Sequence, residues 1–170
     1  NKTWGKNLLY IARNGEYLGF LVIQDPVRPG MKKTLNRMRR LGIDEVVMLT
    51  GDSKDVAAEV ARDMDIDSYH AEILPEDKAN YVMKMQKRGN VMMVGDGIND
   101  APALAFADIG VSLGGNKTDI AAESAAITIR SEDPAKLYDA LYIGRETMRA
   151  INQNFTATIV VNSAAMLLGA

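Results

Sequence analysis

The feature that most constrains this chain is a Gly-Asp-Gly turn at 95–97, which separates a short apolar run from the start of a helix. Residues 91–94 have the length and composition of a buried strand. After the turn, Asn99 and Asp100 can cap a helix that has Pro102 in its first turn. A strand, a tight turn and a helix in this order are typical of parallel α/β folds, which bind ligands at the carboxyl ends of their strands.

Two carboxylates, Asp96 and Asp100, flank this turn. Four residues apart across such a turn, they can converge on one hard cation, with water or phosphate oxygens completing the coordination. The alternative is a structural Asp/Gly turn with an Asx cap. The full run GDGINDAPALA is far more specific than Gly-Asp-Gly alone, so the sequence predicts a ligand site here.

A second strand–turn–helix unit repeats this arrangement earlier in the chain. A buried strand expected at 45–49 leads to Thr50, Gly51 and Asp52, and a helix is expected over 54–64. A hydroxyl, backbone amides and the positive end of a helix dipole then meet at one point, which favours phosphate binding. An ordinary N-cap by Asp52 or Ser53 is compatible with the same residues.

Lys78 follows Pro75, which starts another expected helix. On the first turn of that helix, its ammonium can reach the same strand ends. A surface lysine is the alternative. His70, the single histidine, is far in sequence from any metal-ligand partner and is interpreted as structural.

The rest of the chain fits an α/β fold with a doubly wound, mostly parallel sheet and helices on both faces. An Asn-Gly pair between apolar runs predicts an N-terminal hairpin over 7–25, and the proline-rich segment 24–30 is a stiff linker. Further strands are expected at 69–73, 108–114 and 126–129. Helices are expected at 31–41, where the basic residues are interpreted as mostly solvated, at 120–124 and at 134–151.

The last segment, residues 155–170, carries no charge. Its 16 residues are fewer than the ~20 needed to span a bilayer. We interpret it as the first part of a transmembrane helix that continues the helix before it. A soluble core helix with a polar face of Thr156, Thr158, Asn162 and Ser163 is the alternative.

Composition sets the remaining bounds. With 170 residues, 47% of them hydrophobic and 25% charged, the chain can build one ordinary globular domain. The net charge of −2 gives no indication of a nucleic-acid partner, and the absence of cysteine excludes disulfides and thiolate metal sites. The abrupt start at Asn1 and the apolar end suggest that both ends are cut.

The motifs together resemble P-type cation-transporting ATPases, whose phosphorylation domain has a haloacid-dehalogenase-like, Rossmann-like fold. The matching elements are GDGINDAP, Thr-Gly-Asp at 50–52, Pro-x-x-Lys at 75–78 and Asp-Pro-x-Arg at 25–28, in the family's order. The short spacing to the apolar run, and the Gln-Asn pair at 153–154, are most similar to the heavy-metal-transporting branch.

The resemblance implies a role for each site residue. Asp96 and Asp100 would hold Mg²⁺ and Asn99 would orient the site. Thr50 and Gly51 would contact phosphoryl oxygens within the Thr-Gly-Asp motif that Asp52 completes. Lys78 would balance charge between nucleophile and phosphate, and Asp25 and Arg28 would lie at the hinge near ATP.

The resemblance also implies the organisation and activity of the parent protein. Residues 1–24 would end a nucleotide-binding domain, 25–30 would form the hinge, 31–151 part of the phosphorylation domain, and 152–170 the start of a transmembrane helix. The parent would be an ATP-driven pump in the cell membrane, with a metal cation of unknown identity and the remaining pump domains as partners. The family's nucleophile, in an Asp-Lys-Thr-Gly-Thr segment, is absent from this sequence, so the chain alone is expected to be inactive.

Two other functions remain open. One is a soluble haloacid-dehalogenase-like phosphatase, which would need an N-terminal nucleophile and has no use for the final apolar run. The other is a non-catalytic module that keeps the fold and binds Mg²⁺.

Overall fold

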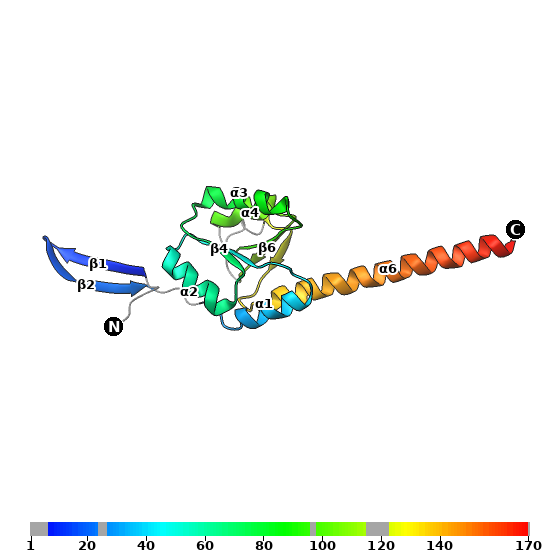
Figure 1. The fold of residues 1–170 in the computed structure, drawn as a ribbon, viewed down its shortest axis with the longest axis horizontal. Coiled ribbons are helices and arrows are strands. Elements are labelled where there is room, and N and C mark those ends of the chain that lie inside the picture. Colours follow the sequence, from blue (N-terminus) through cyan, green and yellow to red (C-terminus); the bar gives the residue numbers. More distant parts are fainter. Residues whose placement is uncertain (1–6, 24–26, 96–97, 115–122, 170) are drawn as a thin grey trace.

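The computed structural model describes residues 7–23, 27–95, 98–114 and 123–169. Asp25, Asp96 and most of the helix expected at 120–124 lie outside these residues. Helices cover both faces of the parallel strands, as the sequence predicts. In Figure 1, α3 and α4 lie above the strands, and α1 and α2 lie below them. The fold is therefore the predicted α/β class, with an added N-terminal hairpin and a C-terminal helix.

Five short parallel strands form the centre of the fold. β3 (Val47–Leu49) pairs with β4 (Ser68–His70), while β5 (Met92–Gly95), β6 (Ile109–Leu113) and β7 (Ile127–Ile129) form a three-stranded sheet. Among the described residues, no ladder of hydrogen bonds joins β3 to β5. The strands are parallel as expected, but they form two sheets.

The helices begin close to the predicted positions. The lower layer contains α1 (Met31–Arg40) and α2 (Lys54–Met64), and the upper layer contains α3 (Pro75–Gln86) and α4 (Ala101–Phe106), which follows a 3₁₀ turn, η1 (Ile98–Asp100). The α1 helix ends where Gly42 adopts a left-handed φ of 86°, a conformation that glycine adopts without strain.

Alanines, not the larger apolar residues, make the closest contacts of α2. Ala57 and Ala61 are buried, whereas Val56 and Val60 are half-buried. The small side chains let the helix backbone approach its neighbours closely, which puts the two valines at the edge of the contact.

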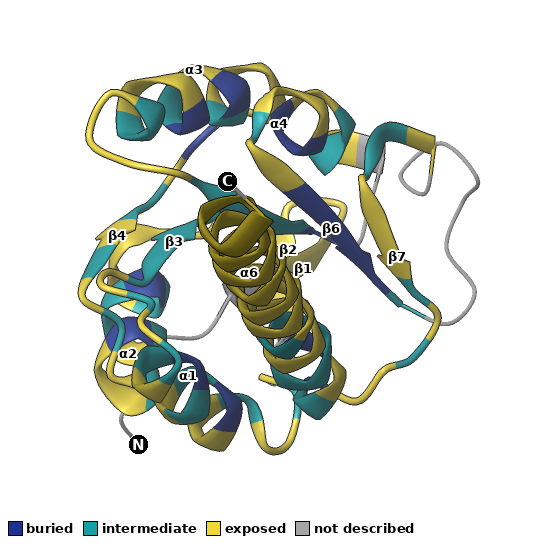
Figure 2. Cartoon of the chain, turned by 90° about the vertical axis from the view of Figure 1, so that its right-hand side faces the viewer, coloured by how far each residue is buried: buried dark blue, intermediate teal, exposed yellow. Residues whose placement is uncertain are grey.

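The core lies between α1, β6 and the C-terminal helix α6 (Ala135–Gly169). Met38, Val111, Leu113 and Leu137 are buried together there. Figure 2 shows β6 as the most buried strand, with α6 viewed nearly end-on beside it. The core is therefore centred on the strand next to the turn that carries the predicted site.

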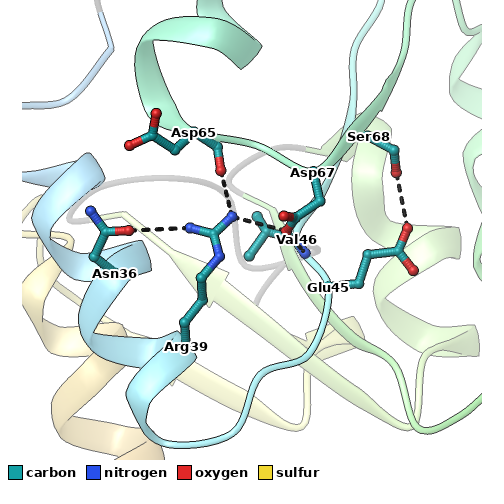
Figure 3. A network of polar contacts seen from close by, with 7 residues as sticks. All are labelled: Asn36, Arg39, Glu45, Val46, Asp65, Asp67 and Ser68. Carbon is teal, nitrogen blue, oxygen red and sulfur yellow. Dashed lines mark hydrogen bonds and ion pairs between the residues drawn. The ribbon is translucent and has the colours of Figure 1, made fainter.

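A polar network holds α1 to the segments that precede β3 and β4 (Figure 3). Arg39 donates to the backbone carbonyl of Asp65 and to Asp67 Oδ2 at 2.9 Å, and the same Asp67 oxygen accepts the Val46 N–H at 2.8 Å. The Val46 N–H and the Arg39 guanidinium hold the pKa of Asp67 below its usual value. Arg39 is thus a structural residue and not the solvated surface residue expected from its position on a basic helix face.

The hairpin is formed as predicted. β1 (Asn7–Arg13) and β2 (Glu16–Ile23) are antiparallel, and the two turn residues Asn14 and Gly15 have φ values of 50° and 82°. Positive φ at both positions is the signature of a type I′ hairpin turn. In Figure 1 the hairpin lies apart from the α/β core, and its large apolar side chains, such as Tyr10 with 66% exposure, are solvent-facing.

The C-terminal helix is one uninterrupted element of 35 residues, so the predicted continuity of 134–151 with the apolar tail is confirmed. Its length is about 52 Å. Only its first turns pack on the core, and for this reason the apolar residues Ile143, Met148 and Ile151 further along the helix are exposed. No helix within the described residues is both long and apolar enough to cross a membrane.

Candidate active site

The structure brings Lys78 and Asp100 together above the carboxyl end of β5. The Lys78 Nζ lies 2.6 Å from Asp100 Oδ1, and the two side chains are only 16% and 13% exposed. Lys78 comes from the first turn of α3, and Asp100 ends η1. Two residues selected from separate motifs therefore form one part-buried ion pair.

Gly95 makes room for this pair. A Cβ at Gly95 would lie 2.7 Å from the Cβ of Asp100 and 2.8 Å from Asp100 Oδ2. Such a distance is not tolerated between real atoms, so the close approach of η1 to β5 requires glycine. The sequence indicates a turn at this glycine, but its steric relation to Asp100 depends on the three-dimensional packing.

Asp100 occupies the N-cap position of α4, as predicted, but its side chain makes no capping hydrogen bond. Its carboxylate bonds to Lys78 instead, because a charged partner attracts a carboxylate more strongly than a neutral N–H does. Asn99 lies exposed within η1.

The Thr50 loop forms a second cluster, at the carboxyl end of β3. The Thr50 hydroxyl donates to Asp52 Oδ2 at 2.8 Å and accepts the Asp52 N–H at 3.1 Å. The Thr50 backbone bonds to the His70 carbonyl and to the Ile73 N–H, both at 3.0 Å. This loop leads directly into α2, whose first-turn N–H groups are available to an anion.

The alternative interpretation of this loop, a side-chain N-cap, is not observed. Ser53 is the N-cap residue of α2 and makes no side-chain cap hydrogen bond, and the Asp52 carboxylate accepts from Thr50 instead. The ring of His70, which the sequence interpretation treats as structural, lies 4.5 Å from that of Tyr81, centroid to centroid.

Arg28 pairs with a residue that sequence reasoning missed. Its guanidinium lies 3.1 Å from Glu132 Oε2, and its side chain is 24% exposed. Glu132 lies between β7 and α6, more than one hundred residues away, so no local pattern could have indicated the contact. The pair joins the segment before α1 to the segment before α6.

The described residues include only part of the predicted metal site. Among them, no group of three or more His, Cys, Asp or Glu side chains could hold a metal ion. Asp96, the principal predicted ligand, is not described. Asp100 has one oxygen bonded to Lys78, which leaves Oδ2 as the remaining acceptor.

The fold and this strand-end site place the chain in a known class. Residues 5–108 match the family "haloacid dehalogenase-like hydrolase", and the chain belongs to that family.

Comparison with curated proteins narrows the class. The chain is 43% identical over 163 residues to a zinc-exporting P-type ATPase of Mycobacterium marinum, covering 95% of this chain and 22% of that protein. It is 38% identical over 169 residues to copper-exporting P-type ATPase B of Archaeoglobus fulgidus, covering 99% of this chain and 24% of that protein. The chain thus spans less than a quarter of the length of these relatives.

A solved structure is also similar to this chain. A zinc-transporting PIB-type ATPase in the E2.Pi state superposes with a TM-score of 0.81 at 33% identity, covering 97% of this chain and 27% of the other. The chain therefore corresponds to the haloacid dehalogenase-like phosphorylation domain of heavy-metal P-type ATPases, as the resemblance implied.

Proposed function

We propose that this chain is the Mg²⁺- and phosphate-binding part of an ATP-driven metal-cation pump. The observation that carries the proposal is the Lys78–Asp100 pair at 2.6 Å, because it puts a part-buried ammonium at the strand edge that the family uses for phosphoryl transfer. The relatives named above export zinc and copper, so a transition-metal cation is the proposed cargo.

Lys78 can hold Asp100 and still contact a phosphoryl group. An ammonium has three N–H donors, and Asp100 accepts one of them. Lys78 would stabilise the negative charge that accumulates on the phosphoryl oxygens during transfer. Asp100 would keep the ammonium in place throughout, since a lysine side chain is otherwise flexible.

The Thr50 loop would bind the phosphoryl group from the other side. Gly51 and the first turn of α2 would supply backbone N–H donors, and the Thr50 hydroxyl would donate once it rotates away from the Asp52 carboxylate. Asp52 would therefore position the hydroxyl, and Asn99, in η1 after β5, would orient the site.

Asp96 and Asp100 would hold Mg²⁺, with Asp100 contributing through Oδ2 or a bound water, since Oδ1 bonds to Lys78. When bound, Mg²⁺ neutralises charge on phosphoryl oxygens. Asp25 and Arg28 would lie near ATP at the hinge, where Arg28 is held by Glu132.

The nucleophilic aspartate would come from the rest of the pump. Within the described residues, β3 pairs only with β4 and β5 only with β6, so each has an edge with no described strand partner. A strand inserted between these edges would complete one sheet, and its carboxyl end would lie between Thr50 and the Lys78–Asp100 pair. We place the nucleophile on that strand.

The domain limits of the chain would follow those of such a pump. Residues 1–24 would end the nucleotide-binding domain, 25–30 form the hinge and 31–151 belong to the phosphorylation domain. Residues 152–170 would begin a membrane-entering helix, so that the α/β part lies on the cytoplasmic side of the cell membrane.

Phosphorylation of the full-length pump tests this function. With radiolabelled ATP, Mg²⁺ and Zn²⁺, the parent should form a hydroxylamine-sensitive phosphoenzyme, and Lys78→Met should lower its amount at least about tenfold. Lys84→Met, an exposed lysine on the same helix, is the matched control and should be phosphorylated normally. Normal phosphorylation of Lys78→Met would contradict the proposal.

The isolated chain provides a second test. It should form no phosphoenzyme, because the Asp-Lys-Thr-Gly-Thr segment is absent from its sequence. Mg²⁺-dependent hydrolysis of p-nitrophenyl phosphate by this chain alone would instead favour the soluble phosphatase, which the alignment of 95% of this chain with a pump does not support.

A further inference from the structure

A groove separate from the phosphate site lies along one side of α1. Its volume is about 780 Å³, and its walls are the segment 27–30, the outer face of α1 and Met64 at the end of α2. We call this feature the basic groove. It shares residues 27–30, Arg28 included, with the proposed hinge, but none of its lining residues belongs to the strand-end clusters of Thr50, Lys78 and Asp100.

The basic groove concentrates positive charge on a chain whose net charge is −2. Five lining residues are basic and none is acidic: Arg28, Lys32, Lys33, Arg37 and Arg40. Three of them are already engaged, Arg28 with Glu132, Lys32 with Asp65 at 2.9 Å, and Arg37 over the Tyr138 ring at 3.6 Å. Within the described part of the chain, Lys33 and Arg40 have no carboxylate partner, and both are exposed.

The spacing of these cations favours an extended ligand over a small anion. Lys33, Arg37 and Arg40 follow the pattern i, i+4, i+7, so they form a row on one helix face about 10 Å long. A single phosphate group requires donors that converge on one point, and a row does not provide them. A chain with several negative charges matches the row better.

The walls of the groove are apolar as well as charged. Val27, Met31 and Met64 contribute aliphatic surface beside the cations, and Val27 is 36% exposed. The occupant that fits therefore combines carboxylates with apolar side chains, which is a property of a peptide.

A membrane surface fits the position of the groove less well. Arg37 contacts Tyr138 near the start of α6, and Phe155, where the uncharged run begins, is 17 residues further along, or about 26 Å along the helix axis. In Figure 1, α1 lies at the core end of α6 and the tail points away from it. Lipid headgroups around the tail would not reach the groove.

We propose that the basic groove docks an acidic peptide segment that carries apolar side chains, with Lys33 and Arg40 as its principal charge partners. The segment belongs to another domain of the same pump, since this chain spans less than a quarter of the relatives' length, and this choice of partner rests on the proposed function. This site is distinct from the phosphoryl-transfer site, and its failure would leave the proposed function unaffected.

Fluorescence anisotropy with a defined probe tests the proposal. The probe is a fluorescein-labelled peptide of repeated Glu-Glu-Leu, and the control probe replaces each Glu with Gln. The 170-residue chain in a non-ionic detergent should bind the acidic probe and not the Gln probe, and added salt should weaken binding. Equal binding of the two probes, or no binding of the acidic probe, would overturn the proposal.

Charge-reversal variants locate the binding surface. Lys33→Glu/Arg40→Glu should weaken binding of the acidic probe by about tenfold. Lys84→Glu/Lys87→Glu changes the net charge equally on α3 and at its C-cap, in the opposite helix layer, and should change binding less than about twofold. Equal loss in both variants would mean non-specific attraction and would overturn the proposal. Circular dichroism checks folding, and Lys33→Gln/Arg40→Gln replaces the reversal variant if that variant does not fold.

Competition separates the peptide from other anions. Inorganic phosphate, ATP and a short-chain phosphatidylglycerol are added at ionic strength matched with NaCl. None should displace the probe beyond the effect of NaCl. Displacement by one of them that also depends on Lys33 and Arg40 would assign the groove to that ligand and overturn the peptide proposal.

Discussion

The ammonium of Lys78 lies 2.6 Å from a carboxylate oxygen of Asp100, although the two residues come from different helical segments. The contact ties the first turn of α3 to η1 directly above the carboxyl end of β5. It also fixes the orientation of the Lys78 side chain before any ligand binds. The side-chain entropy is therefore lost on folding, and binding does not have to compensate for it.

A double-mutant cycle should measure this coupling. Lys78→Met leaves a part-buried carboxylate without its partner and should lower the free energy of unfolding by about 2 kcal/mol. Asp100→Asn should have a smaller effect, and the double variant should be more stable than the sum of the two losses predicts. Urea denaturation of the four proteins gives the interaction energy. Strictly additive losses would mean that the pair contributes nothing.

Glycine positions should differ sharply in their tolerance of alanine. At Gly110 an added Cβ would lie 2.3 Å from the Leu104 carbonyl oxygen, and at Gly95 it would lie 2.7 Å from Asp100 Cβ. Both substitutions should cost about 2–4 kcal/mol of stability, with Gly110→Ala the worse because it meets backbone. Gly89→Ala, which meets nothing within 4 Å, is the matched control. Similar melting temperatures for all three variants would show that the packing around β5 and β6 is looser than described.

Magnesium should stabilise the chain through Asp96. We expect a higher melting temperature at millimolar Mg²⁺ by mass action, and Asp96→Asn should remove this response while leaving the metal-free stability little changed. Asp63→Asn, on the exposed surface of α2, should respond as the unmodified chain does. A full Mg²⁺ response in Asp96→Asn would place the metal elsewhere.

Acid should weaken the polar network that joins Arg39 to Asp67 and Val46 before β3 and β4. The pKa of Asp67 is lowered in the fold, first by the Val46 N–H and then by Arg39. The ionised carboxylate therefore contributes stability above its unfolded-state pKa, and this contribution is lost as the pH falls through the lower, folded-state pKa. Asp67→Asn should flatten the dependence of stability on pH below about pH 4. Chemical denaturation at pH 7, 4 and 3 makes the comparison, and identical pH profiles for the unmodified chain and Asp67→Asn would contradict the assignment.

The apolar tail should be dispensable for folding. Removing residues 154–170 takes away only side chains that are exposed where the structure describes them, so solubility should rise and cooperative unfolding should persist. Removing residues 135–170 also deletes Leu137 from the core and should abolish cooperative unfolding. Loss of cooperativity in the shorter deletion would mean that the tail belongs to the core.

Local patterns predicted what depends on local chemistry. The hairpin turn at Asn14-Gly15, the start of α3 at Pro75 and the limits of α2 follow from turn residues, caps and periodicity, and the structure confirms all three. The motifs likewise identified Lys78 and Asp100 before their contact was known. A short segment of sequence carries all the information that these features require.

Features that depend on distant packing could not be predicted. Arg39 was expected to be solvated because the sequence does not show that Asp67, 28 residues later, lies beside it. The Asp100 side chain looked like a helix cap because its competing partner is 22 residues earlier. Ala57 and Ala61 are buried while Val56 and Val60 are only half-buried, and this depends on how closely α2 approaches its neighbours, which helix periodicity does not determine.

The unbroken course of α6 has a mechanical consequence. Its first turns are anchored by Leu137 in the core and by Tyr138 under Arg37, and its hydrogen-bonded backbone then runs on to Gly169 without a proline or a change of direction. A rod of this kind bends little over such a length, so a rotation of the α/β body is transmitted and amplified. Over the roughly 36 Å between Arg145 and Gly169, a tilt of about 10° moves the far end by about 6 Å, more than one helical turn. The helix can act as a lever arm that converts small rearrangements around the strand ends into large displacements at the tail.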